Sequence, residues 1–311
     1  MPQPSHDFLP PMQELAREAG ALLMSFFGKV SIEYKGEADL VTKADRAAEK
    51  LIVERIRKQW PHHDLLGEEG SRTETGSDYR WYIDPLDGTT NFAHGYPVFC
   101  VSLGLDYKGE RIAGVIFDPC RDEMFAAEKG SGAQLISGRP GTPVPSGQLS
   151  GERLPSDQLS GGPTPGGQLE ARAIRVSPTA HLVESLIATG FPSYKRHKNP
   201  NIHFYHQLTL RSHGVRRAGS AALDLCYVAC GRYDAFWEFN LNPWDTAAGV
   251  LIVQEAGGAV TNFSGGPFTI DSQQVLASNT LLHDELLKEF AAIFAGRVEG
   301  LPSVEEYQRS R

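Results

Sequence analysis

The sequence contains little cysteine, and its few cysteines are not arranged as a disulfide framework. Four cysteines occur in 311 residues, and no two of them form a CxxC pair. Disulfide-stapled domains are much shorter and much richer in cysteine, because the crosslinks replace a large core. We therefore expect a cytoplasmic protein, kept reduced, whose stability comes from an ordinary hydrophobic core.

Positive charge is also scarce. The chain has 30 Lys and Arg residues against 38 Asp and Glu residues, which gives a formal net charge of -8. A general nucleic-acid binder normally carries a basic excess, so we expect no nucleic-acid partner. An acidic protein that handles an anionic substrate would need metal ions to mediate between the like charges.

Long apolar runs are missing as well. The longest, such as residues 98–105, fall well short of the ~20 residues that a membrane-spanning helix requires. The first residues, MPQPSHDFLPPMQEL, lack the basic stretch followed by an apolar stretch that marks a secretory signal. We expect neither membrane insertion nor export. With 41% hydrophobic residues, the chain is long enough to bury a full globular core.

One internal segment, about residues 139–171, is poor in aromatic and β-branched residues and rich in Gly, Pro, Ser and Gln. The related stretches PSGQLSG, PSDQLSG and PGGQLEA begin at Pro145, Pro155 and Pro165. Such a composition buries too little apolar area to offset its ordering entropy. We interpret the segment as a flexible insertion in a single domain, between an N-terminal part (about 1–138) and a C-terminal part (about 172–296). A disordered tail would follow at about 297–311.

The rest of the chain interleaves helical and strand patterns. This alternation predicts an α/β protein with layered sheets and helices. The expected helices cover residues 12–27, 42–60, 201–211, 220–230, 243–256 and 281–294. The expected strands cover residues 79–83, 98–106, 112–118, 123–128, 185–189, 233–239, 259–261 and 275–277.

Acidic residues gather where these elements meet. In WYIDPLDGTTNF, Asp84 ends an apolar strand and Asp87 begins what looks like a helical turn. Pro85 fixes the backbone between them, so the two carboxylates can converge on one point. Element ends are where α/β proteins place their sites. The other acidic positions of this kind are Asp39 with Asp45, Glu68 with Glu69, and Asp245 in NPWD.

Convergent carboxylates repel each other and must be protonated or neutralised by cations. Hard oxygen ligands with no His or Cys nearby select Mg²⁺. Gly88, Thr89 and Thr90 add backbone N–H groups at a helix start, which suits a phosphate. Metals beside a phosphate cradle favour metal-assisted phosphoryl chemistry. Taken singly, each of these motifs is more often structural, as a turn or a solvated face. Only their occurrence together favours a catalytic site.

The combination resembles a known family. GEEG at Gly67, WYIDPLDGTTNF at Trp81 and NPWDTAAGVLIVQEAGG at Asn242 closely resemble motifs of the inositol monophosphatase family. The similarity also includes DLVTKAD at Asp39 and AGSAALDLCYVACG at Ala218. The resemblance implies an alternating αβαβα sandwich of the inositol monophosphatase and fructose-1,6-bisphosphatase type. It also implies Mg²⁺-dependent, Li⁺-sensitive hydrolysis of small phosphate monoesters.

The resemblance further implies which residues bind the metals. Glu68, Asp84 and the backbone carbonyl of Leu86 would hold a first Mg²⁺. Asp84, Asp87 and Asp245 would hold a second, so that Asp84 bridges the pair. A third, weaker ion near Glu68 would bring the number of ions from two to three.

Catalytic roles follow from the same resemblance. In this family the nucleophile is a water on the first metal, whose pKa the cation lowers. Glu68 and Thr89 would orient or deprotonate that water, and Asp45 would hydrogen-bond the Thr89 hydroxyl. Lys35 matches a family lysine near the metal site.

The substrate would be bound at both of its ends. Backbone N–H groups of Gly88 and Thr89 would bind phosphate oxygens. Glu238, seven residues before Asp245, matches the family glutamate that contacts a ring hydroxyl, although a solvated strand-end carboxylate is an equal alternative. The full expected substrate set is Asp87, Gly88, Thr89, Ser220, Ala221, Glu238 and Asp245.

These implications favour hydrolysis of inositol 1-phosphate to myo-inositol and phosphate. Relatives with the same metal motif cleave fructose 1,6-bisphosphate, histidinol phosphate or a 3'-phosphoadenosine nucleotide, and GEE at Gly67 favours the inositol and sugar phosphatases. A regulatory protein that keeps the fold and acts through partners is an alternative of a different class. The presence of every metal carboxylate favours catalysis. By resemblance we also expect a homodimer.

Overall fold

The computed structural model describes residues 8–29, 33–34, 40–41, 43–138, 170–191 and 199–300. Its first half contains α1 (Leu9–Phe26), β1 (Glu33–Tyr34), β2 (Leu40–Val41), α2 (Lys43–Gln59), β3 (Asp64–Gly67), β4 (Arg72–Thr73), β5 (Tyr79–Asp87), α3 (Thr89–Ala93), β6 (Cys100–Tyr107), β7 (Glu110–Asp118), β8 (Glu123–Glu128) and β9 (Ala133–Ser137). The second half contains β10 (Glu170–Ile174), a 3-10 turn (Leu182–Glu184), β11 (Leu186–Thr189), α4 (Asn201–Arg211), β12 (Gly214–Arg216), α5 (Ala221–Ala229), β13 (Ala235–Phe239), α6 (Pro243–Glu255), β14 (Ala259–Thr261), β15 (Gln274–Ser278) and α7 (His283–Phe294).

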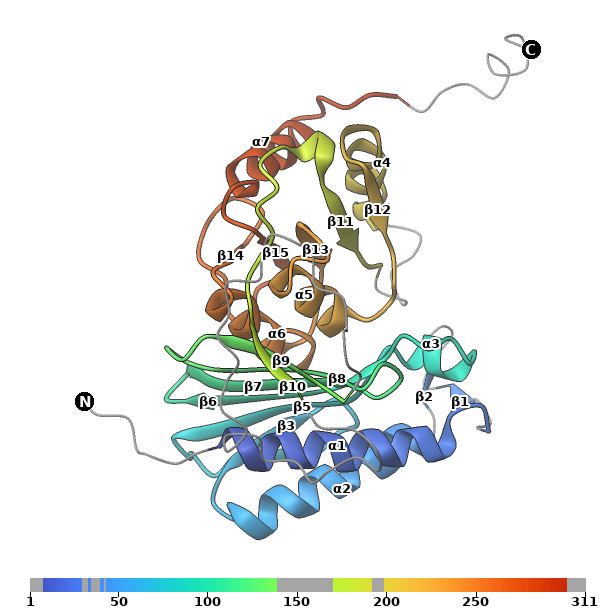
Figure 1. Cartoon of the computed structure of the whole chain (residues 1–311), viewed down its shortest axis with the longest axis vertical. Helices are drawn as coiled ribbons and strands as arrows, with labels where there is room; N and C mark the ends of the chain where they lie inside the picture. The colour runs from blue at the N-terminus through green and yellow to red at the C-terminus, as the bar shows by residue number, and fades with distance from the viewer. Residues whose placement is uncertain are drawn as a thin grey trace.

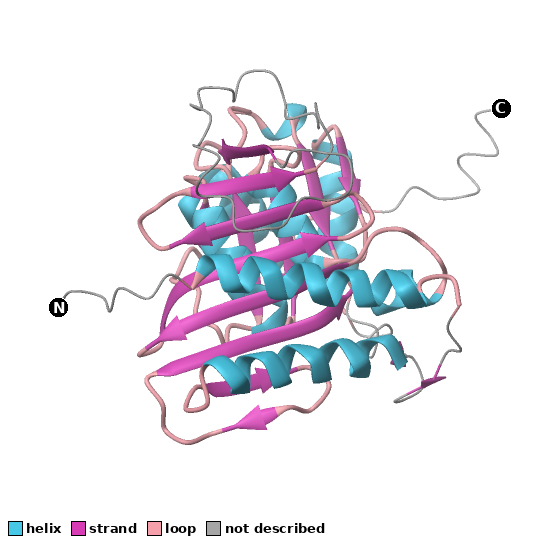
Figure 2. Cartoon of the chain, turned by 60° about the horizontal axis from the view of Figure 1, so that its bottom comes forward, coloured by secondary structure: helices cyan, strands magenta, loops and turns pink. Residues whose placement is uncertain are grey.

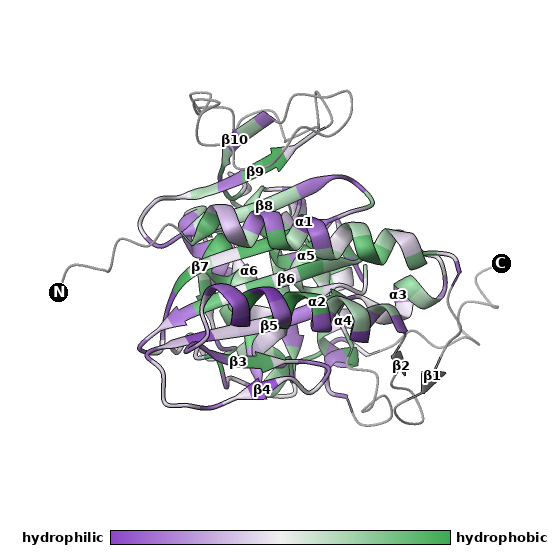
Figure 3. Ribbon diagram, turned by 90° about the horizontal axis from the view of Figure 1, so that it is seen from below, coloured by the Kyte–Doolittle hydropathy of each residue, from purple (hydrophilic) through white to green (hydrophobic). Residues whose placement is uncertain are grey.

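The larger sheet has eight strands in the order β10-β9-β8-β7-β6-β5-β3-β4. Its strands pair antiparallel except for β3, which runs parallel to β5. Helices α1 and α2 lie side by side over one face of this sheet (Figure 2). Their polar residues face outward (Figure 3), and their buried residues, among them Met12 and Ile52, pack toward the strands. This amphipathic pattern is why both helices can be recognised in the sequence.

Helix α1 shows how local sequence sets an element's ends. Pro10 and Pro11 stand in its first turn, where a missing N–H costs least. At the other end Gly28 adopts a φ of 76°, a left-handed conformation that ends helices and that glycine adopts without strain. The helix begins three residues earlier and ends one residue earlier than the predicted range of 12–27.

A second sheet of five strands, in the order β12-β11-β13-β15-β14, forms another layer. Helices α5 and α6 lie between the two sheets, and α4 and α7 cover the far side (Figure 1). The expected alternating αβαβα sandwich is therefore confirmed.

Helix α6 is buried along nearly its whole length, from Thr246 to Val253. A helix that is apolar on all sides needs neighbours on all sides, and the two sheets provide them. The larger sheet approaches it closely through two glycines. A Cβ on Gly104 would lie 2.7 Å from Ala247 Cβ, and one on Gly114 would lie 2.9 Å from Ala248 Cα.

Several predictions fall outside the described residues. These are Lys35, Asp39, the first residue of the helix expected over 42–60, the insertion up to residue 169 and the tail from residue 301. The division into domain parts stays a prediction. The ends of the insertion are adjacent, because Ser137 of β9 pairs with Glu170 of β10.

The sequence patterns missed short strands, namely β1, β2, β3, β4, β9, β10 and β12, whereas the five-residue α3 lies where a helix start was predicted after Asp87. Strands as short as β3 (DLLG) contain too few residues to show a period. Among the described residues, no helix has the length and apolar character needed to cross a bilayer.

Candidate active site

A cavity of about 190 Å³ opens where the predicted site residues meet. Its acidic lining comes from the loop after β3, the end of β5, and the starts of α5 and α6, together with β13. Of the predicted residues, Glu68, Asp87, Gly88, Thr89, Ser220, Ala221, Glu238 and Asp245 line it. Asp84 and Leu86 are buried in the same turn as Asp87. The expected residues therefore converge from five separate segments of the chain.

The two aspartates of DPLD point to one place because strand β5 has an irregularity between them. Asp84 pairs with Ser102 and Asp87 with Cys100, so β5 has one residue more than β6 in this interval. Such a bulge bends the strand and redirects its side chains. Leu86 N donates to Asp84 Oδ1 at 3.0 Å, which closes the turn around Pro85. The strand thus continues through Pro85, beyond the predicted end at residue 83.

Asp87 is held by the first turn of α5. Ser220 Oγ donates to Asp87 Oδ2 at 2.6 Å, and Ala222 N donates to the same oxygen at 2.7 Å. Burial raises the pKa of Asp87, and these hydrogen bonds oppose the rise because they favour the ionised form. Ser220 is also the N-cap of α5, so one side chain links the helix start to the carboxylate.

The Thr89 hydroxyl lies between two acceptors. It is 3.1 Å from Asp45 Oδ1 and 3.1 Å from the carbonyl oxygen of Leu86. The hydrogen bond expected between Thr89 and Asp45 is therefore present. Asp45 is fully buried on α2, so the helix that covers the sheet contacts a residue that lines the cavity.

The GEEG loop that carries Glu68 is anchored by Glu49 of α2, a residue that the sequence reading did not single out. Glu49 is 4% exposed, and its carboxylate accepts from Glu69 N at 2.8 Å and from Ser71 N at 3.0 Å. A Cβ on Gly67 would lie 2.5 Å from Glu49 Oε2, so only glycine allows this approach. Glu49 thereby fixes the loop on which Glu68 stands.

Replacing Glu49 with glutamine should lower the free energy of unfolding by about 2 kcal/mol, because one of the two backbone N–H groups then faces an amide NH₂. Urea titration measures the change. Glu54→Gln is the matched control on the same helix, since its side chain is 67% exposed and lies 3.9 Å from Lys50 in a surface ion pair. Equal stability of the two variants would contradict the anchoring role of Glu49.

Asp245 stands at the start of α6 in a capping box. Asn242 N donates to Asp245 Oδ2 at 2.6 Å, and the Asn242 side chain accepts from the backbone of residue 245 in return. Burial, together with the charge of Asp87, raises the pKa of Asp245 to about 8, against the effect of the Asn242 hydrogen bond. The capping box therefore fixes the position of a carboxyl group that burial keeps protonated near neutral pH.

Asp84 is buried among the other carboxyl groups of the cluster. Burial raises its pKa well above the usual range, and the charges of Glu68, Asp87 and Asp245 add to the rise. Groups that disfavour each other's charge in this way either hold protons or bind cations. Their oxygen atoms are the ligands that a hard divalent cation such as Mg²⁺ prefers, so the donor set fits the expected metal.

The carboxylates are neighbours but are not arranged as a finished metal site. Within the described ranges, no three His, Cys, Asp or Glu side chains already stand as ligands of one ion. Asp87 and Asp245 accept hydrogen bonds from the protein itself.

Two charged residues of the cavity were not predicted. Asp224 lies on α5, and Arg217 lies just before it, where Arg217 Nη2 donates to Phe191 O at 3.4 Å. Asp224 could have been noticed as the one charged residue within the apolar run AALDLCYVAC. No comparable sequence pattern pointed to Arg217. Glu238 faces the same end of the cavity, and burial raises its pKa to about 8, with Arg217 opposing and Asp87 adding to the rise.

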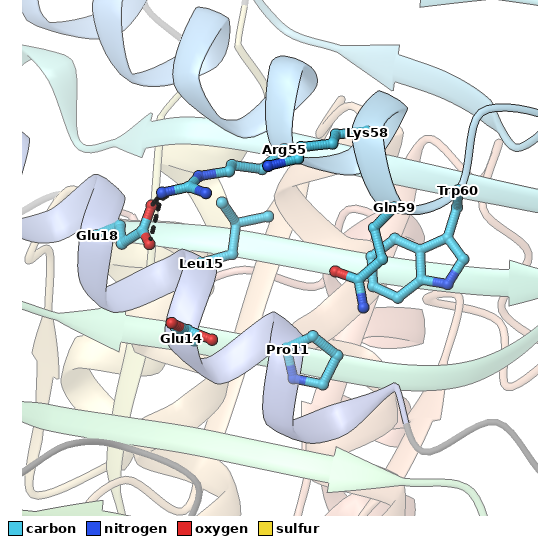
Figure 4. A pocket seen from close by; sticks show the side chains of 8 residues that line it. All are labelled: Pro11, Glu14, Leu15, Glu18, Arg55, Lys58, Gln59 and Trp60. Carbon is cyan, nitrogen blue, oxygen red and sulfur yellow. Dashed lines mark hydrogen bonds and ion pairs between the residues drawn. The ribbon is translucent and has the colours of Figure 1, made fainter.

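A second, larger hollow of about 380 Å³ lies between α1 and α2 (Figure 4). Two of its charged groups pair with each other, since Arg55 Nη2 lies 2.9 Å from Glu18 Oε2, and Trp60 forms part of its wall. It holds no group of convergent carboxylates. We therefore assign the chemistry to the smaller cavity.

Comparison with known proteins places the chain among phosphatases. A family model described as the inositol monophosphatase family matches residues 6–295. The inositol-1-monophosphatase of Synechocystis is 42% identical over 284 residues, covering 90% of this chain and 87% of that protein. The Nus factor SuhB of Pseudomonas aeruginosa is 40% identical over 282 residues, covering 88% and 91%. The solved inositol monophosphatase from Anabaena (Nostoc) has a TM-score of 0.74 at 38% identity, covering 94% and 97%.

Proposed function

Because the chain belongs to the inositol monophosphatase family of phosphatases, we propose that it hydrolyses inositol 1-phosphate to inositol and phosphate with the help of Mg²⁺. The observation that carries the proposal is the convergence of Glu68, Asp84, Asp87 and Asp245 on one cavity. Carboxyl groups with raised pKa values in such a cluster need cations to become fully ionised. A cation-loaded cavity then suits a phosphate dianion.

The residues that would hold the metals are Glu68, Asp84 and the Leu86 carbonyl for one ion, and Asp84, Asp87 and Asp245 for another. A third ion beside Glu68 belongs to the same proposal. When bound, Mg²⁺ neutralises charge on the phosphate and lowers the pKa of a water.

The chain's own groups around Thr89 would handle the proton of the attacking water. Glu68 and Thr89 border the cavity, and the Thr89 hydroxyl donates to the buried Asp45 at 3.1 Å. With its own proton directed at Asp45, the Thr89 oxygen is left to accept one from water. We propose that Glu68 takes up the proton that the water releases.

Gly88 and Thr89 are proposed to bind the phosphate through their backbone N–H groups. Gly88 has a φ of 99°, and a Cβ there would lie 2.9 Å from the carbonyl oxygen of Val98. Only glycine fits this tight turn, and we propose that the turn presents consecutive backbone amides to the phosphate. Ser220, Ala221 and Glu238 would line the part of the cavity that holds the polyol.

A phosphate-release assay tests the proposal. The panel contains inositol 1-phosphate, fructose 1,6-bisphosphate, histidinol phosphate and 3'-phosphoadenosine 5'-phosphate, each with Mg²⁺, with EDTA, and with Mg²⁺ plus Li⁺. We expect the highest kcat/KM for inositol 1-phosphate, loss of activity in EDTA and inhibition by Li⁺. Full activity in EDTA would overturn the metal requirement, and a higher kcat/KM for another substrate would overturn the inositol assignment.

A regulatory role is the second candidate, because a relative at 40% identity is named Nus factor SuhB. Such a role would act through a protein partner and would not need catalysis. A strain carrying Asp87→Asn separates the two functions, since its growth would be normal only if catalysis were dispensable. The homodimer and the cytoplasmic location expected from the sequence remain predictions.

A further inference from the structure

Asp224 places a carboxylate in the cavity wall that the proposed mechanism does not use. It lies on α5, one helical turn after Ser220, and its side chain is 1% exposed. Burial, followed by the charges of Glu238 and Asp87, raises its pKa well above the usual range. A carboxylate in this position is unfavourable for the free protein, so its presence needs an explanation.

One oxygen of this carboxylate has no partner. Asp224 Oδ1 is buried and forms no hydrogen bond. Among the buried side-chain atoms that lack a partner in the described ranges, it is the one that belongs to a residue lining the cavity. Folded proteins rarely leave a buried acceptor unsatisfied, and a ligand that inserts a donor at this end of the cavity would satisfy it.

Glu238 supplies a second carboxylate at the same end. It is 7% exposed on β13, and a Cβ on Gly190 would overlap its carboxyl group, so a glycine makes room for it. The cation beside the two is Arg217, and a Cβ on Gly219 would lie 2.7 Å from its Nη1. This end of the cavity therefore holds two carboxyl groups against one guanidinium, and hydroxyl donors from a ligand would favour the ionised form of both carboxyl groups.

We propose that Asp224, beside Glu238, accepts hydroxyl hydrogen bonds from the polyol part of the substrate and selects monophosphates over bisphosphates. The inference rests on the proposed phosphatase function. Hydroxyl groups donate to carboxylates, whereas a second phosphate brings acceptor oxygens and charge of the same sign. Asp224 is thus a specificity-determining residue, separate from the carboxylates assigned to the metals.

The test is Asp224→Asn, which keeps the shape of the side chain and removes its charge. Kinetics are measured with inositol 1-phosphate, with fructose 1,6-bisphosphate, and with p-nitrophenyl phosphate, whose leaving group has no free hydroxyls to donate. We expect KM for inositol 1-phosphate to rise about tenfold with kcat nearly unchanged, as for loss of a hydrogen bond to a charged group. The preference for inositol 1-phosphate over the bisphosphate should fall at least as much. Turnover of p-nitrophenyl phosphate should stay the same.

The matched control is Asp284→Asn on α7, an exposed position in a helix on the far side of the second sheet. An unchanged preference in Asp224→Asn would overturn this inference and leave the proposed function intact. An equal loss with all three substrates, with a lowered melting temperature, would assign Asp224 a structural role and also overturn it. A wild-type protein that releases phosphate from none of them would overturn the proposed function and this inference together.

Discussion

Replacing Asp84 with asparagine should lower kcat/KM for inositol 1-phosphate by about a thousandfold or more, since Asp84 is the carboxylate proposed to bridge both metals. The same change should raise the melting temperature of the metal-free protein. Asparagine keeps the oxygen that accepts from Leu86 N at 3.0 Å, and it removes a buried carboxyl group whose ionisation Glu68, Asp87 and Asp245 oppose. Phosphate release and thermal melts in EDTA measure the two effects.

Asp78→Asn is the control for this experiment. Asp78 precedes the same strand, is exposed, and lies 3.5 Å from Lys108 in a surface ion pair, so its loss should change neither activity nor stability appreciably. Near wild-type activity in Asp84→Asn would refute the metal site. If Asp84→Asn lowers the melting temperature in EDTA, the Asp84 carboxyl group does not destabilise the metal-free protein.

The metal-free protein should lose stability as the pH rises from about 4 to about 8. The pKa of Asp245 is raised from 3.8 to about 8 in the folded state. Between these values the folded chain holds a proton that the unfolded chain has released, so the free energy of unfolding declines with pH until the folded pKa is passed. Excess Mg²⁺ should reverse the trend, because a metal binds only the ionised carboxylates.

Urea titrations from pH 5 to pH 8.5 can isolate this effect if the wild type is compared with Asp245→Asn. Asparagine can still accept from Asn242 N, so the capping box survives while the titrating group is removed. The stability difference, wild type minus variant, should decline with pH in EDTA and increase with pH in Mg²⁺. A difference that is constant in both conditions would rule out Asp245 as the titrating group.

Much of the fold could be predicted because long elements repeat their pattern many times. Helix α4 runs over residues 201–211 and strand β8 over residues 123–128, as their patterns predict. The family motifs also identified the carboxylates that converge on the cavity. The bulge in β5 could not be predicted, because Pro85 normally marks a turn and only the pairing with β6 shows that the strand continues.

Residues whose role depends on distant neighbours stayed hidden in the sequence. Glu49 has its partners in the backbone of a loop about twenty positions away, and backbone N–H groups leave no trace in a sequence. Asp224 is significant because β13 brings Glu238 beside it. Both belong to contacts that form only when the layers assemble.

The close packing of α6 against Gly104 and Gly114 has a consequence for how variation in this protein is read. Both glycines lie directly behind the first turns of the helix that carries Asp245. A larger residue at either position would push the helix away from the larger sheet. The carboxylate of Asp245 would move with it. In a survey of tolerated substitutions these two positions would look as restricted as the acidic residues, although they take no part in the chemistry. These two positions are restricted because the helix packs too close to the sheet to leave room for a side chain.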